Sequence, residues 1–198
     1  MPPVVVDPTR IHEFSDFQSF YDWLSVHHAT EPEVWIRMHK VSSGLPSITP
    51  VSAIDAALCW GWIDAIRKGL NDTSYLQRYT PRGARSTWSQ INRENVARLV
   101  DAGLMTAHGL RHVESAKADR RWDKAYRVKD ARLPDDLLAA IDAEPEAKAM
   151  LATLTAQNRF ALAFRLNALK TQAGREKRIA AFVDQLKRGE TIYPQKAK

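Results

Sequence analysis

The stretch from Ala57 to Asn92, ALCWGWIDAIRKGLNDTSYLQRYTPRGARSTWSQIN, holds the most informative residues of the chain. It contains three of the six tryptophans, the only cysteine, and four arginines interleaved with tyrosines. This density of cationic and aromatic side chains exceeds what packing alone requires. The stretch is therefore predicted to form the wall of a binding site.

The same stretch predicts a helix end, a hairpin and a helix start. Gly61 is suited to end a helix, and residues 62–66 and 74–80 have the composition of strands. Residues 68–72, with a glycine and an Asn-Asp pair, suit the connection between those strands. Thr87 and Gln90 fit a capping box, so a helix is expected from about Trp88 to Ala102. Its expected buried side comprises Ile91, Val96, Leu99 and Val100.

Upstream of this stretch, the pattern predicts two helices separated by a strand. Aromatic and leucine residues recur at helical spacing from Phe14 to Leu24, before His27 and His28. Residues 34–40 alternate like a strand that places Trp35, Arg37 and His39 on one face. Thr49 and Pro50 favour a helix start, with an expected buried face of Val51, Ile54, Ala57 and Leu58.

Downstream, Thr106 is expected to begin a helix that reaches about Ala118, and the composition changes from Leu133 onward. Alanine is frequent there, strand patterns are missing, and Pro134, Pro145 and Thr155 suit helix starts. The last helix carries an apolar stripe ended by Gly189: Ile179, Phe182, Val183 and Leu186.

These patterns predict an α+β fold that is mostly helical. A small antiparallel sheet with helices is expected in residues 1–130, and this domain carries the Trp/Arg-rich site. A C-terminal helical bundle is expected in residues 133–190. The polar, non-periodic residues 128–132 are interpreted as a linker.

Composition indicates a soluble globular protein of 198 residues, with 44% hydrophobic and 26% charged residues. No apolar run approaches the roughly 20 residues of a membrane-spanning helix, so membrane insertion is not expected. The N-terminus lacks the pattern of a secretory signal, and a single cysteine excludes an intramolecular disulfide. A bacterial cytoplasmic protein is therefore expected.

The net charge of +6 is unevenly distributed. Residues 1–66 carry 3 basic against 8 acidic side chains, residues 67–98 carry 7 against 2, and residues 170–198 carry 8 against 3. A positive field over the middle and the tail favours anionic partners, including nucleic acid. The alternative is that these charges form ordinary solvated faces.

The strongest candidate site combines arginines with aromatic rings near a helix start. Arg78, Arg82 and Arg85 can present planar donors to a carboxylate or phosphate, and the amides near Trp88 also favour an anion. The aromatic rings could stack on a ligand ring. The predicted ligand is an anionic or aromatic small molecule or peptide, contacted by Lys40, Trp62, Asp64, Arg78, Arg82 and Trp88.

Catalytic and metal chemistry have weaker candidates. Cys59 could act as a thiolate beside a histidine, but a buried structural cysteine is the alternative. Asp64 could be a general base, or it could pair with a nearby arginine. His108 and His112 share a helix face without the glutamate of a zinc motif or an evident third ligand, so no metal site is expected. Walker A, dinucleotide-binding and nucleophile-elbow motifs are missing from the sequence, and nothing implies a cofactor.

Several segments resemble the bacterial YdeI/OmpD-associated family, also called bacteriocin-protection proteins. They are LCWGWID from Leu58, QRYTPR from Gln77, STWSQIN from Ser86, GLMT from Gly103 and WDKAY from Trp122. The C-terminal segments around Pro134 and from Arg175 to Phe182 resemble that family's helical C-terminal domain. The resemblance implies an association with outer membrane protein or with antimicrobial-peptide tolerance. It implies no catalytic residue.

The leading functional prediction is a stress or peptide-tolerance protein that binds the ligand described above. An enzyme of unknown reaction using Cys59 or Asp64 is the first alternative. A nucleic-acid-binding protein that uses the basic middle and tail is the second. The sequence leaves the oligomeric state open.

Overall fold

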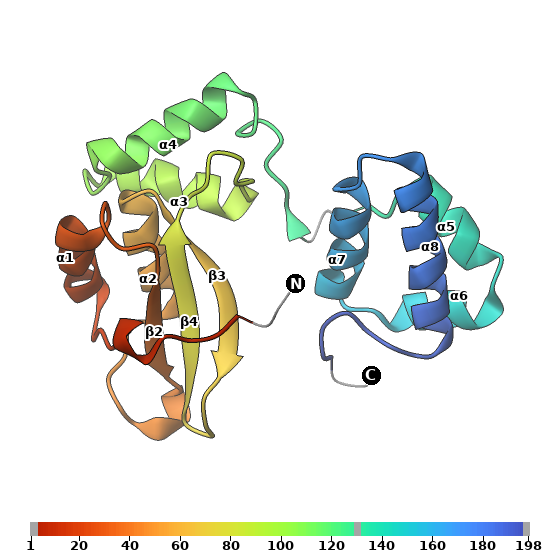
Figure 1. Ribbon diagram of the computed structural model, residues 1–198, viewed down its shortest axis with the longest axis horizontal. Helices are drawn as coiled ribbons and strands as arrows, with labels where there is room; N and C mark the ends of the chain where they lie inside the picture. The colour runs from red at the N-terminus through yellow and green to blue at the C-terminus, as the bar shows by residue number, and fades with distance from the viewer. Residues whose placement is uncertain (1–3, 129–131, 196–198) are drawn as a thin grey trace. The chain divides into compact units, whose positions relative to one another are not determined.

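The computed structural model describes residues 4–128 and 132–195. The chain divides into two compact units between Ala125 and Tyr126 (Figure 1), and each unit is described by itself. Most of the expected linker, residues 129–131, lies outside the described residues. The mostly helical α+β class predicted from the sequence is confirmed.

The N-terminal unit is built on a four-stranded mixed sheet in the order β1-β2-β4-β3. The strands are β1 (Ile11–His12), β2 (Val34–His39), β3 (Trp62–Gly69) and β4 (Ser74–Pro81). The predicted hairpin is β3 and β4, which pair antiparallel, and β4 also pairs antiparallel with β2. The sequence did not predict β1, which adds a short parallel edge to β2.

Helices α1 (Phe17–His27) and α2 (Pro50–Cys59) lie on one face of this sheet (Figure 1). Asp16 and Ser19 form a reciprocal capping box at the start of α1, and Thr49 caps α2 as predicted. The core between helices and sheet contains Phe20, Leu24, Val34, Ile36, Met38, Trp62 and Tyr79. Val51 is 64% exposed, so its predicted burial is wrong; alanines of α2 fill the core side instead.

Helices α3 (Gln90–Asp101) and α4 (Ala107–Ala118) pack near one end of the sheet (Figure 1). The predicted Thr87 cap of α3 is wrong, because the Ser89 hydroxyl accepts the Asn92 amide and the helix begins after it. Val96 and Leu99 are buried as predicted, whereas Ile91 and Val100 are exposed. The predicted Thr106 cap of α4 is confirmed.

The opposite face of the sheet is crossed by the N-terminal segment (Figure 1). This segment includes the short helix η1 (Pro8–Arg10), and the Lys68 ammonium donates to the Val4 carbonyl. Trp35 lies on this face and is fully buried. A second short helix, η2 (Val41–Ser43), follows β2.

The C-terminal unit is a helical bundle of α5 (Asp135–Asp142), α6 (Pro145–Thr153), α7 (Ala156–Asn167) and α8 (Gln172–Lys187). The predicted cap Thr155 begins α7, and Gly189 has the positive φ expected of a residue that ends a helix. Of the predicted stripe of α8, Phe182, Val183 and Leu186 lie in the core and Ile179 packs against it partly buried. The core also contains Leu137, Ile141, Leu154, Leu162 and Leu166. In the part of the chain that the structure describes, no helix is long and apolar enough to span a bilayer.

Candidate functional site

The six residues predicted to contact a ligand lie in several places on the N-terminal unit. The exposed Lys40 follows β2, and its amide bonds to the Thr73 carbonyl beside the start of β4. Arg82 follows the other end of β4, and its amide bonds to the Gly61 carbonyl. Because β4 spans eight residues, Lys40 and Arg82 are separated by roughly 25 Å of strand.

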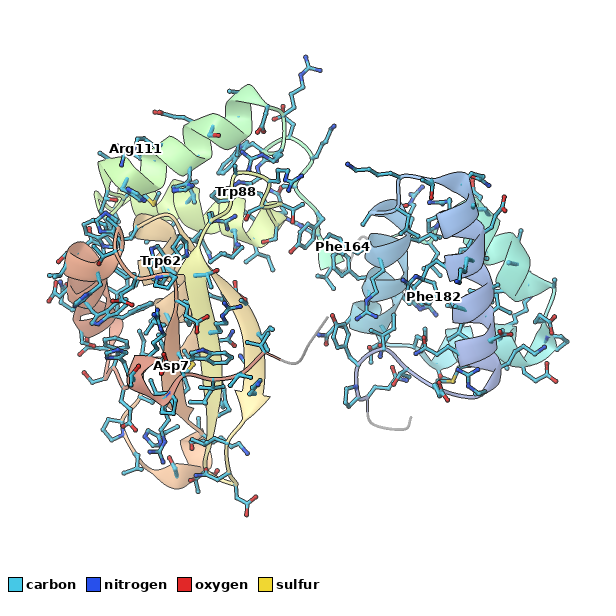
Figure 2. All side chains as sticks on the ribbon, viewed as in Figure 1. Asp7, Trp62, Trp88, Arg111, Phe164 and Phe182 are labelled. Carbon is cyan, nitrogen blue, oxygen red and sulfur yellow. The ribbon has the colours of Figure 1, made fainter. Side chains whose placement is uncertain are left out.

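Arg82 and Trp88 do lie together, as a buried pair. Arg82 is 5% exposed and Trp88 is 2% exposed, and the guanidinium lies 3.7 Å from the indole centroid. An Nη atom of Arg82 also donates to the Thr87 carbonyl at 3.3 Å. These contacts hold the loop between β4 and α3 and explain why α3 starts later than predicted. Figure 2 shows Trp88 beside α3 and α4, away from Trp62.

Arg78 takes part in an ion pair. Its Nη2 lies 2.5 Å from Oε2 of Glu33, and the indole of Trp35 donates to the other oxygen of that carboxylate at 3.1 Å. The Arg78 side chain is about one quarter exposed and Glu33 is mostly covered. Glu33 also lines the cavity described below. Arg78 therefore supports one wall of that cavity from behind.

Trp62 is fully buried, and its indole donates to the His28 carbonyl at 3.2 Å. Its ring meets Trp23 edge to face, with centroids 6.0 Å apart. Asp64 follows on β3 at the protein surface, just before an irregularity in the pairing of β3 with β4. Although Asp64 is exposed as a residue, neighbouring groups remove part of the hydration of its carboxylate and raise its pKa, and the charges of Arg82 and Arg67 oppose that change.

Cys59 is a poor candidate nucleophile in this fold. The residue is fully buried among apolar side chains that include Leu58, Val96 and Val113. Burial raises the pKa of the Cys59 thiol to about 12, and the nearby Asp55 adds to the effect. A thiolate is therefore strongly disfavoured at neutral pH, which argues against the enzyme alternative that uses this residue.

His108 and His112 project from one face of α4, as predicted, and meet a third histidine. The ring centroids of His28 and His108 are 4.5 Å apart, and those of His108 and His112 are 5.3 Å apart. Burial lowers the pKa of both α4 histidines, and nearby positive groups lower it further. Among the described residues, no three His, Cys, Asp or Glu side chains are arranged to hold a metal ion.

A cavity of about 320 Å³ lies where η1 and β1, the end of α1, and the approach to β2 meet. Its size is at the lower end of the roughly 300–1,000 Å³ of typical small-ligand sites. Each of these three segments contributes to the wall, which comprises Thr9, Arg10, His12, Trp23, His27, Glu31 and Glu33.

Aromatic rings form one wall of the cavity. His27 stacks on Trp23 with centroids 4.6 Å apart, and His12 lies 5.3 Å from the same indole. Partial burial lowers the pKa of His12, and the charge of His27 contributes, while Glu31 opposes the change. The imidazole of His12 is therefore held mainly in its neutral form at pH 7.

Charged side chains form the other wall. The Arg10 guanidinium donates to Glu31 at 3.1 Å and to Asp7 at 3.3 Å. The Glu33 carboxylate pairs with Arg78 and accepts a hydrogen bond from the Trp35 indole. Both carboxylates of the wall are thus engaged by cationic groups. A ligand would meet an aromatic platform beside an arginine whose planar donors match carboxylate or phosphate.

Sequence reasoning missed this cavity because its residues come from separate segments without a common motif. The available signal was small: Trp23 and His27 are four residues apart in α1 and therefore share a helix face. The contribution of Arg10 and His12 depends on β1, which has only two residues and no readable strand pattern.

Two family models match the chain. Residues 12–112 match a family described as Domain of unknown function (DUF8412), and residues 130–189 match a family described as Bacteriocin-protection, YdeI or OmpD-Associated. The chain therefore belongs to the DUF8412 family and carries a YdeI/OmpD-associated domain at its C-terminal end. No curated protein and no solved structure gives a significant match.

The resemblance stated from the sequence is confirmed in the C-terminal helices. Of the motifs quoted for it, the segments between Leu58 and Thr106 lie inside the domain of unknown function.

Proposed function

We propose that the N-terminal unit is a non-enzymatic binding domain for a small aromatic molecule with an anionic group, such as the carboxyl end of a short peptide. The observation that carries this proposal is the cavity in which Trp23 and His27 stack beside Arg10. The ligand ring lies against the Trp23–His27 platform. Its anionic group accepts hydrogen bonds from Arg10, whose bonds to Asp7 and Glu31 use Nε and Nη1 and leave the donors of Nη2 for the ligand. His12 and Thr9 add hydrogen-bonding groups.

We further propose that the protein acts in stress or antimicrobial-peptide tolerance in the bacterial cytoplasm. The C-terminal family's description as bacteriocin protection supports this role. Catalysis by Cys59 is not part of the proposal, because this thiol is buried with a raised pKa, whereas an enzyme that uses Asp64 stays an alternative. Nucleic-acid binding stays the second alternative: Arg78, Arg98 and Arg67 of the basic middle bond to Glu33, Asp55 and Gln77, which leaves fewer of their donors for phosphates.

The first test is a thermal-shift screen of the full chain with aromatic carboxylates and aromatic dipeptides. A ligand found in this way should bind the Arg10→Gln variant about tenfold more weakly, because a charge-assisted hydrogen bond is lost. Arg37→Gln is the matched control, since Arg37 also pairs with one glutamate, Glu13, at 3.2 Å and is similarly exposed. Equal binding by wild type and by both variants would refute the cavity as the site.

The six contacts predicted from the sequence lie apart in the fold, and the two arginines among them have their own test. Arg78→Ala combined with Arg82→Ala should weaken binding of any ligand that these arginines contact. Arg82→Ala alone separates that effect from the support that Arg78 gives to Glu33 in the cavity wall. If every ligand from the screen binds the double variant as before, these arginines are not part of the site. Loss of binding in Arg10→Gln together with retained binding in the double variant would place the ligand in the cavity alone.

A further inference from the structure

The C-terminal unit has a groove of about 400 Å³ between α5 and α8. Ion pairs join the two helices at both ends of this groove. Arg175 near the start of α8 binds Asp136 near the start of α5 at 2.5 Å, and Lys187 at the end of α8 binds Glu144 just after α5 at 2.7 Å. The two helices therefore run in the same direction, with the groove between the two pairs.

The floor of the groove is apolar because small residues line the seam between the helices. Ala140 comes from α5, Ala143 directly follows that helix, and Ala180 comes from α8; their short side chains leave the hollow open. Ile179, which is partly buried, provides the larger apolar surface, and Val183, one helical turn further along α8 and 8% exposed, closes the bottom of the groove. The bundle core, which contains Leu137, Phe182 and Val183, lies beneath the groove.

The rim of the groove carries acidic side chains. Glu144, Glu176 and Asp184 line it, with no lysine or arginine among the described lining residues; Glu144 is already paired with Lys187, so Glu176 and Asp184 supply the unpaired negative charge. Glu176, Ala180 and Asp184 are spaced by four residues, so they form one row along α8 that is roughly 12 Å long. This local acidity contrasts with a chain whose net charge is +6.

From this arrangement we infer that the groove binds a basic amphipathic helix of a partner protein or peptide. Its apolar residues, at helical spacing, lie on Ile179 and Val183, and its lysines or arginines reach the acidic rim. A row of roughly 12 Å matches about two turns of such a helix. Two parallel helices with small residues at their seam also offer a groove into which the ridges of a third helix pack.

The probe for a binding test is a labelled helical peptide of leucine and lysine with 3.6-residue periodicity. Its counterpart has every lysine replaced by glutamate. Fluorescence anisotropy with the full chain should show tighter binding of the basic peptide, which weakens as salt is raised. The long-range field of a +6 chain would favour the acidic peptide, so a preference for the basic one requires the local acidic rim.

Two sets of variants locate the binding. Ala180→Gln fills the hollow and should weaken binding of the basic peptide about tenfold, whereas Ala181→Gln, on the same helix outside the groove, should not. Glu176→Lys combined with Asp184→Lys should have a similar effect. Its control is Asp101→Lys combined with Glu114→Lys, which changes the net charge equally at exposed positions of the N-terminal unit. Circular dichroism checks that each variant is folded.

The inference would be overturned by equal binding of the two peptides, or by equal losses in the groove variants and their controls. Sedimentation of the full chain tests the other possible occupant of the groove, which is a second copy of this chain. A concentration-dependent dimer that Ala180→Gln abolishes would assign the groove to self-association and would also overturn the inference. Failure here leaves the cavity proposal intact, because the two experiments probe different units.

Discussion

At Gly109, α4 packs closely against the end of α2. A Cβ atom placed on Gly109 would lie 2.3 Å from the carbonyl oxygen of Cys59 and 2.9 Å from that of Leu58. Backbone atoms cannot rotate away as a side chain can, so the two helices would have to separate. We expect Gly109→Ala to lower the free energy of unfolding by about 1–3 kcal/mol, measured by urea denaturation.

The matched control for this substitution is Gly69→Ala. A Cβ atom at Gly69 meets no atom within 4 Å, and its φ is not positive. We therefore expect a change within about 0.5 kcal/mol at this position. If the two substitutions changed the free energy of unfolding equally, the close approach of the helices would not be the reason why position 109 requires glycine.

The histidines of α4 predict a pH dependence of stability. The folded protein lowers the pKa of His108 and His112 below the usual 6.5, so the unfolded chain binds more protons than the folded protein below that pH. The stabilisation is complete above pH 6.5 and is lost as the pH falls through the folded pKa. Urea midpoints should therefore decrease from pH 7.5 to pH 5.5, and the decrease should be smaller in the variant His108→Gln/His112→Gln.

At the scale of elements, Thr106 joins the start of α4 to the end of α2. Its hydroxyl oxygen accepts the Gly109 amide at 3.1 Å and its proton is donated to the Cys59 carbonyl at 2.6 Å. We expect Thr106→Ala to cost about 1–2 kcal/mol of unfolding free energy, because it removes a cap and a tertiary hydrogen bond. Thr106→Ser retains the hydroxyl and should recover most of this stability in the same urea experiment.

Asn158 attaches the segment after α8 to α7. This side chain is 2% exposed; its amide nitrogen donates to the Tyr193 carbonyl and to Gln195, and its oxygen accepts the Tyr193 amide at 2.8 Å. Asn158→Ala should release the segment and increase its cleavage by protease, with a loss of about 1–3 kcal/mol. Asn167→Ala, at the exposed end of α7, is the control and should leave the cleavage rate unchanged.

Helix starts were predictable from the sequence where a single threonine precedes an apolar pattern. Thr49, Thr106 and Thr155 are each the observed cap. The start of α3 was not, because Thr87 and Ser89 are both suitable caps and the choice depends on a tertiary contact. The stack of Arg82 on Trp88 keeps residue 88 outside the helix, and no local pattern reports such a contact.

At the scale of the whole molecule, each unit has its own core. The two clusters of the N-terminal unit share partly buried residues, including Tyr21, Ile54 and Trp60, whereas the third cluster lies entirely in the C-terminal unit. All six tryptophans lie before residue 126, so tryptophan fluorescence reports only on the N-terminal unit. Far-ultraviolet circular dichroism reports on both.

We expect the substitution Leu137→Ala, in the core of the C-terminal unit, to cost that unit about 2–5 kcal/mol. The circular dichroism transition in urea should then begin at a lower concentration, while the tryptophan fluorescence transition keeps its midpoint. A shift of both signals together would mean that the two units unfold as one.

The candidate site was less predictable than the fold. Most helices and the hairpin follow from patterns within a few residues, whereas the cavity brings Arg10, Trp23 and Glu31 together through tertiary packing. The sequence directed attention to Arg78 and Trp62, which support this cavity through Glu33 and Trp23. Their proposed direct contact with a ligand remains a prediction.

The Cys59 thiol can report local opening of the folded protein. It is the only thiol in the chain, and it lies fully buried where α2 ends against α4. A thiol reagent can reach it only in molecules that have opened at this junction, so the labelling rate in native buffer gives the free energy of that opening. This measurement needs no engineered label. It reports on one residue, which becomes accessible only when α2 and α4 separate.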